Sequence, residues 1–288
     1  MNLWPELPYQ AWRDTRDTLH MKLQVVGKIR LALAPFEPQW ANVPLYVTAR
    51  GLTTSPLRHP SGEVFDVDVD LHDHRVRVRT GAGALEEVEL RARPVAEFYE
   101  ELMRALERAQ VPTEITTTPS EVPDPIPFPE DTTHTAYDPE WAHRFSRALA
   151  SIDAVMREHR APFRGRTTPV HFFWGTFDLA LARFSGRPAE PYGDNEIMRR
   201  STDAEQICAG WWPGDERVPA PTFFAYAYPK PDGFEREPGW DDGMGLILLP
   251  YDEVRAADDP RRTLLAFLER TYDAGARLAR WDEALTRV

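Results

Sequence analysis

The segment from Pro169 to Pro188, PVHFFWGTFDLALARFSGRP, combines an imidazole and a carboxylate at a spacing suited to acid–base chemistry. If Gly175 and Thr176 turn a β-hairpin, His171 lies diagonal to Asp178 on the same face. A carboxylate beside an imidazole fixes its tautomer and raises its basicity, as general-base catalysis requires. The alternative is a buried histidine in an aromatic sheet, and a strand without a turn would separate the two side chains.

Two arginines occupy matching places at the ends of apolar strands. Arg50 follows LYVTA and Arg183 follows DLALA, and each precedes a loop that contains hydroxyl side chains. A guanidinium beside hydroxyl groups and glycine can bind a carboxylate or a phosphate. The sequence therefore predicts an anchor for an anionic group of a small-molecule ligand, with a structural salt bridge as the alternative.

Aromatic side chains are concentrated in the second half of the chain. Phe224, Tyr226 and Tyr228 alternate along one predicted strand and therefore share a face. Together with Trp174 and Trp212 they can line a small-molecule pocket, because such pockets combine aromatic walls with few polar groups. The same composition is also typical of a hydrophobic core.

A third cluster, EDTTHTAYDPEWAH, places His134 and Tyr137 just before a predicted helix. Both are candidate ligand-binding residues, and His134 with His171 would supply the histidines of a metal-dependent hydrolase. The H-x-x-x-H and H-x-x-E-H spacings of helical zinc sites do not occur, so we predict no metal site. The glycine-rich motifs of nucleotide-binding folds are also missing, and no cofactor is predicted.

The clearest local element is a hairpin over residues 65–79. Apolar residues alternate with aspartates in FDVDVDL, and valines alternate with arginines in HRVRVR. A turn at His72 and Asp73 would pair three aspartates with three arginines across the strands: Asp66 with Arg79, Asp68 with Arg77 and Asp70 with Arg75. Each carboxylate then has a cationic partner on a solvated face, which favours a structural role over metal binding.

The elements that position these residues follow a similar plan in two halves. Helical periodicity predicts four helices, at about 8–34, 94–110, 138–159 and 260–284. Gly27 is a point at which the first helix could break or bend, and the proline-rich residues 111–130 predict an extended surface connector. We expect one compact α+β unit over 1–288. Its halves, 1–110 and 131–288, would each contain a helix, antiparallel strands and a helix, with helices on one face of each sheet.

Composition limits the possible partners. The 288 residues carry a formal net charge of −12, which disfavours nucleic acids and anionic membranes. The one cysteine, Cys208, cannot form an internal disulfide and lacks the surroundings of a reactive nucleophile. The N-terminal segment lacks the regions of a signal peptide, and no apolar stretch is long enough to span a bilayer. A cytoplasmic monomer or homodimer is expected.

Three segments resemble a bacterial protein family of unassigned function: LYVTARGLTTSPL (45–57), HFFWGTFDLALARFSGR (171–187) and FFAYAYP (223–229). The resemblance implies one continuous unit and brings no activity. The residues themselves favour a cofactor-independent small-molecule enzyme or ligand-binding protein, with its pocket where the halves meet. The alternatives are a metal-dependent hydrolase and a non-catalytic interaction protein, and the latter predicts no enclosed cavity of about 300 Å³ or more.

Overall fold

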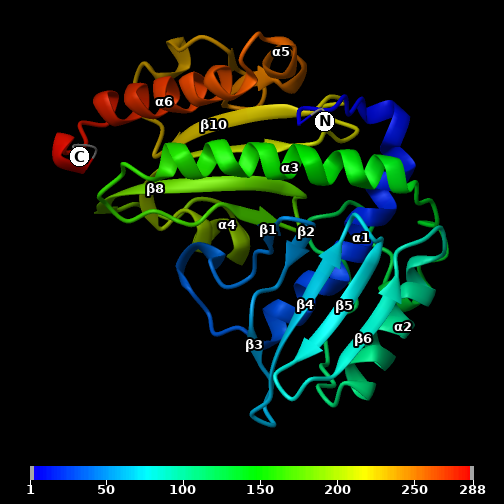
Figure 1. Cartoon of the computed structure of the whole chain (residues 1–288). Helices are drawn as coiled ribbons and strands as arrows, with labels where there is room; N and C mark the ends of the chain where they lie inside the picture. The colour runs from blue at the N-terminus through cyan, green and yellow to red at the C-terminus, as the bar shows by residue number, and fades with distance from the viewer. Residues whose placement is uncertain (1–2, 286–288) are drawn as a thin grey trace.

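The computed structural model describes residues 3–285, which form six α-helices and two antiparallel sheets of six strands each, so the chain is α+β as predicted. The first half contains α1 (Tyr9–Leu33), β1 (Tyr46–Thr48), β2 (Gly51–Thr53), β3 (Leu57–Arg58), β4 (Val64–Asp70), β5 (Arg75–Thr80), β6 (Leu85–Glu89) and α2 (Val95–Arg108). The second half contains α3 (Pro139–Arg160), β7 (His171–Phe173), β8 (Asp178–Pro188), α4 (Glu196–Ser201), β9 (Ala204–Trp212), β10 (Thr222–Tyr228), β11 (Trp240–Asp241), β12 (Leu246–Pro250), α5 (Tyr251–Ala256) and α6 (Pro260–Leu278) (Figure 1).

The first sheet is a meander, with neighbours in the order β1, β2, β4, β5, β6 and with β3 paired to β4. The β4–β5 hairpin has the predicted register: Asp66 lies opposite Arg79, Asp68 opposite Arg77 and Asp70 opposite Arg75. On the other face Val67, Val69, Val76 and Val78 are buried, since side chains alternate along each strand. The alternation of charged and apolar residues therefore fixes both the register and the face that packs inward.

The second sheet has the strand order β11, β12, β10, β9, β8, β7 and is also nearly a meander. Helices α3 and α6 pack on the face where Leu179, Leu181 and Ile207 are buried. Figure 1 shows α6 on one side of this sheet and the short helix α4 on the other. The face that α4 covers only in part carries the candidate site.

The two sheets meet at their edge strands. Leu45 and Phe172 exchange both backbone hydrogen bonds, each 3.0 Å long, so β1 and β7 lie side by side. One hydrophobic core cluster contains residues from both halves, among them Trp12, Phe65 and Trp211. The halves therefore share a core.

The first helix does not break at Gly27, as the sequence suggested it could. α1 continues to Leu33, because Gly27 serves packing: a Cβ on it would lie 2.2 Å from Cγ of Trp174. The indole ring occupies that space, so the helix tolerates the cost of glycine to gain a close approach to the β7–β8 turn.

Two other boundaries differ from expectation. α6 ends at Leu278 because Arg280 adopts a left-handed conformation (φ 54°) and the Trp281 N–H donates to the Ala276 carbonyl, which closes the helix in a Schellman turn.

Residues 111–130 do not simply lie on the surface. Val111 and Phe128 are buried, and the connector packs along α1.

Among residues 3–285, no helix has both the length and the apolar character needed to cross a bilayer.

Candidate functional site

The open face of the second sheet is hollow because its centre consists of small residues. The strand registers place Ala180 opposite Gly210, and Ala182 opposite Cys208, on neighbouring strands β8 and β9. A Cβ on Gly210 would lie 2.3 Å from the Phe224 ring, so only glycine lets that ring lean over the strand. Ala180, Ala182 and Cys208 form the floor of a cavity of about 880 Å³, which is within the range of small-molecule sites, while the Phe224 ring lies against Gly210.

Larger side chains rise around this floor. Asp178 and Trp212 border one end, and His171 and Phe173 border the β7 side. The opposite wall and the far end are formed by Phe224, Tyr226, Gln206 and Tyr228. Four of the five predicted aromatic ligand-binding residues line the cavity, namely Trp174, Trp212, Tyr226 and Tyr228, and Phe224 lines it as well.

Residues from the first half close another side of the cavity. Leu31, Trp40 and Val43 line it, and the Trp40 indole N–H donates a 3.1 Å hydrogen bond to the Ile197 carbonyl on α4. The cavity is therefore bounded by residues of both halves.

Asp178 is a buried carboxyl group that faces the cavity. Its residue is only 9% exposed, and its Oδ1 accepts a hydrogen bond from the Thr176 hydroxyl. Burial raises the pKa of Asp178 to about 7, and the nearby charge of Glu121 adds to this rise while the Thr176 hydrogen bond opposes it. A carboxyl group with such a pKa can hold or release a proton near neutrality.

His171 lies on the same face as Asp178, because Phe173 pairs with Asp178 and His171 pairs with Ala180, as the hairpin predicts. The imidazole is 1% exposed, its Nε2 has no hydrogen-bond partner among the described residues, and its ring packs edge-on against Phe173. Burial lowers the pKa of His171 to about 4. No hydrogen bond joins His171 to Asp178 in the described chain, so the two groups share the cavity without forming a direct pair.

The thiol of Cys208 is part of the floor. Burial raises the pKa of Cys208 to about 12, so the group is a neutral thiol near pH 7. It behaves as a small apolar residue, in agreement with the expectation from the sequence.

Arg183 lies outside the cavity. Its guanidinium is buried on the opposite face of the sheet, where it donates to the His159 carbonyl and lies 4.3 Å from the ring centroid of Tyr272. Burial lowers the pKa of Arg183 to about 10. Because the positions of Asp178 and Arg183 on one continuous strand differ by an odd number, their side chains point to opposite faces of the sheet.

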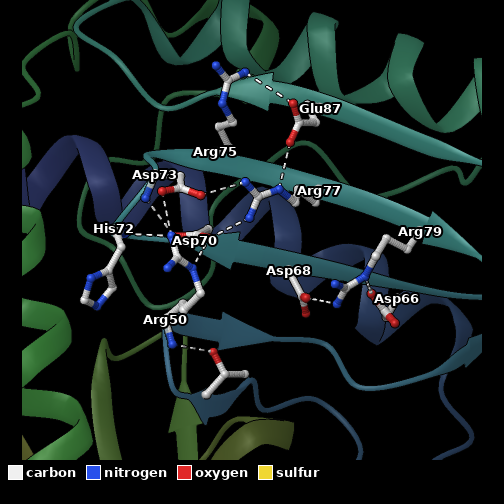
Figure 2. A network of polar contacts seen from close by, with 11 residues as sticks. Arg50, Asp66, Asp68, Asp70, His72, Asp73, Arg75, Arg77, Arg79 and Glu87 are labelled. Atoms are coloured by element: carbon white, nitrogen blue, oxygen red, sulfur yellow. Dashed lines mark hydrogen bonds and ion pairs between the residues drawn. The ribbon is translucent and has the colours of Figure 1, made fainter.

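Arg50 belongs to a separate ion-pair network on the first sheet (Figure 2). It contacts Asp70 and Asp73, at 2.6 Å each, and Arg77 also binds Asp70 at 2.6 Å. Asp70 further accepts the backbone N–H groups of His72 and Asp73. This network ties the β4–β5 turn to the β1–β2 turn, so Arg50 has a structural partner and is not near the cavity floor.

His134 and Tyr137 are also placed elsewhere. His134 contacts the buried carboxylate of Asp131 through Nδ1 at 2.7 Å, and this contact raises its pKa. The Tyr137 hydroxyl is hydrogen-bonded to Nδ1 of His74 at 2.8 Å. Of the two histidines proposed for a metal centre, only His171 lines the cavity, and residues 3–285 contain no group of three or more side chains arranged to hold a metal ion.

Sequence reasoning missed Glu121 as a cavity residue. Glu121 is partly exposed to solvent, but its carboxylate lies against Gly175, where a Cβ would be 2.4 Å from Oε2, and burial raises the pKa of Glu121. No local pattern could have revealed this contact, because the connector and the β7–β8 turn are distant in sequence. The floor residues were missed for a similar reason, since small apolar residues are equally common in closed cores.

Comparisons with known proteins give a family and no activity. The model of a family described as a family of unknown function, DUF5996, matches residues 4–288. No curated protein and no solved structure matches the chain. The match confirms the resemblance to an uncharacterised family, and it covers nearly the whole sequence.

Proposed function

Because the chain belongs to the DUF5996 family of unknown function, its role must be inferred from the site, and we propose that the cavity binds a largely apolar small molecule. The observation that supports this proposal is the floor of Ala180, Ala182 and Cys208 beneath aromatic walls. A closed core would fill such a space with larger side chains, since protein interiors are packed to crystal-like density. A cavity of about 880 Å³ also lies within the size range of small-molecule sites.

Among the polar groups that line the cavity, two titratable side chains of the β7–β8 hairpin lie on the same face as its floor. Asp178 offers a carboxyl group, and His171 offers an imidazole whose Nε2 has no protein partner in residues 3–285. A polar atom of a ligand beside Nε2 would remove the cost of burying that nitrogen without a hydrogen bond. We therefore propose that these two groups make polar contacts with the ligand and that the floor and the aromatic walls make apolar contacts with it.

Filling the floor tests the proposal. Ala180→Leu extends a side chain into the empty space, so we expect at least a tenfold loss of affinity for an uncharged dye such as Nile red, measured by its fluorescence. The fold should change in stability by about 1 kcal/mol or less, because the new atoms enter a cavity and displace no packed neighbour.

Ala150→Leu is the matched control, because Ala150 lies exposed on α3. It should leave dye binding unchanged. Equal dye binding by the wild type and Ala180→Leu, with both proteins folded by circular dichroism, would overturn the proposal. Extraction of the purified protein followed by mass spectrometry then identifies any small molecule that the wild type retains and the filled variant loses.

Catalysis on the bound molecule is a second candidate function. The observation that favours it is the carboxyl of Asp178, since its pKa of about 7 suits a general acid or base at neutral pH. Once a retained molecule is identified, Asp178→Asn should convert it at least about a hundredfold more slowly than the wild type at saturating concentrations of this molecule. Conversion at the wild-type rate by this variant would exclude Asp178 from the chemistry.

A further inference from the structure

The charges that border the cavity are unevenly compensated. Six charged residues line it: Arg16, Arg217, Lys230, Glu121, Asp178 and Asp215. The three cations already have ion-pair partners, namely Arg16 with Asp17 at 2.9 Å, Arg217 with Asp215 at 3.0 Å and Lys230 with Glu235 at 2.6 Å. In the described chain no cation pairs with Glu121 or Asp178, so two carboxyl groups face the cavity without a counter-ion.

Both of these carboxyl groups lie at the same end of the cavity, beside the β7–β8 turn. Asp178 is the first residue of β8, and the Glu121 carboxylate lies against Gly175 in the turn itself. Burial raises the pKa of Asp178, and the charge of Glu121 adds to this rise, as expected for two carboxyl groups at one end of a cavity. Two neighbouring carboxylates repel each other, and a cation between them would remove that repulsion.

The surrounding side chains suit a cation as well. Trp174, Phe173 and Trp212 line the same end of the cavity, and the faces of aromatic rings attract positive charge. His171 does not oppose a cation, because burial keeps its imidazole neutral near pH 7. The His171 side chain is 1% exposed and its unpartnered Nε2 is a second polar group that a ligand can satisfy.

We infer that the ligand of this cavity carries a protonated amine, which binds between Asp178 and Glu121 while its apolar body lies against the aromatic walls. This inference rests on the proposed function, binding of a small molecule in the cavity. It replaces the anionic ligand group expected from the sequence, because Arg183 lies on the other face and the three cations of the cavity are already paired. An anion would have to approach two carboxylates without a free cation to hold it.

A series of probes with one apolar chain and different charge tests the inference. Octylamine, octanol and octanoate are titrated at pH 8 by calorimetry or by tryptophan fluorescence. A charge-assisted hydrogen bond contributes about 1.5–3 kcal/mol, so we expect octylamine to bind about ten- to a hundredfold more tightly than octanol. Octanoate should bind more weakly than octanol.

Neutral substitutions of the two carboxyl groups provide a second test of the inference. Asp178→Asn and Glu121→Gln should each reduce the preference for octylamine over octanol by about tenfold. The matched controls should leave the preference unchanged: Glu114→Gln changes an exposed carboxylate of the same connector, and Asp153→Asn changes a buried aspartate of α3 outside the cavity. Glu121→Gln alters an exposed residue, so it keeps the test valid if Asp178→Asn fails to fold.

The outcomes separate this inference from the proposed function. Octanol binding that equals or exceeds octylamine binding overturns the amine inference and leaves a cavity that takes apolar molecules. An unchanged amine preference in both carboxyl variants overturns it too. Failure of all three probes, together with dye binding that is insensitive to Ala180→Leu, overturns the proposed function itself.

Discussion

Replacement of Asp178 by asparagine is expected to stabilise the fold above neutral pH. Asparagine keeps the shape of the side chain and an oxygen that can accept the hydrogen bond from Thr176, but it carries no charge. The wild-type carboxyl is buried, and no cation pairs with it among residues 3–285. A buried carboxylate without a counter-ion is unfavourable, so the folded state either protonates it or bears the penalty.

The magnitude follows from the pKa. Burial raises the pKa of Asp178 from 3.8 to about 7 in the folded state. Between these pH values the folded state holds a proton that the unfolded state has released, so the free energy of unfolding falls as the pH rises. The full change amounts to about 4 kcal/mol, at about 1.4 kcal/mol per pH unit. Water in the cavity reduces the penalty, so we expect about 2 kcal/mol or more.

Urea unfolding of the wild type and of Asp178→Asn from about pH 4.5 to 8.5 measures this effect. The informative quantity is the difference in the free energy of unfolding between the two proteins at each pH. Burial lowers the pKa values of His20, His159 and His171, but these histidines are present in both proteins, so their contributions cancel. We expect the variant to be more stable by about 2 kcal/mol or more at pH 8 and nearly equal at pH 4.5. A difference that does not change with pH, or a variant that is less stable at pH 8, would refute the reasoning.

Two further predictions concern residues outside the cavity. Asp70→Ala should lower the free energy of unfolding by about 3 kcal/mol or more at pH 7, because the buried carboxylate binds two guanidinium groups and two backbone N–H groups. These hydrogen bonds hold the pKa of Asp70 below its ordinary value, so the wild-type advantage should begin to decline as the pH falls below about 4, and a pH-independent loss would contradict this. Arg183→Met should leave dye binding unchanged and alter the free energy of unfolding by about 1 kcal/mol or less, because it removes a desolvated charge between aromatic rings. Loss of dye binding in a folded Arg183→Met protein would return Arg183 to the site.

The parts of the fold that could be predicted are those that depend on local sequence patterns. The register of the β4–β5 hairpin followed from alternating aspartates, arginines and valines, because each side chain's face is fixed by the two-residue period. The buried stripe of α2 followed from helical spacing: Val95, Phe98, Leu102, Ala105 and Leu106 are all buried as expected. Asp138 caps α3 by accepting the N–H of Glu140, as its place before proline predicts.

The site itself was harder to predict, because it depends on strands that meet in space. β9 was not expected as a strand, since QICAGWW is apolar on both faces and shows no alternation in polarity. Its Cys208 becomes part of a cavity floor only because Ala182 of β8 lies opposite it, next to Ala180 on the same face. The face of Arg183 could be predicted, however. Arg183 and Asp178 differ by an odd number of positions on one strand, so their side chains are expected on opposite faces of the sheet.

The aspartates of the two sheets differ in their cationic partners, and this difference bears on the role of Asp178. On the first sheet, the aspartates and arginines of the outer face form ion pairs with one another, and Asp70 has two guanidinium partners (Figure 2). On the second sheet, Asp178 stands at the end of a row of small apolar residues and accepts a hydrogen bond from the Thr176 hydroxyl, and no cation pairs with it among residues 3–285. A protein that needed this carboxyl only for stability would have placed a cation beside it, as the first sheet does. The missing partner therefore argues that the counter-ion comes with the ligand, and that stabilisation by Asp178→Asn and loss of amine binding should occur together in the same variant.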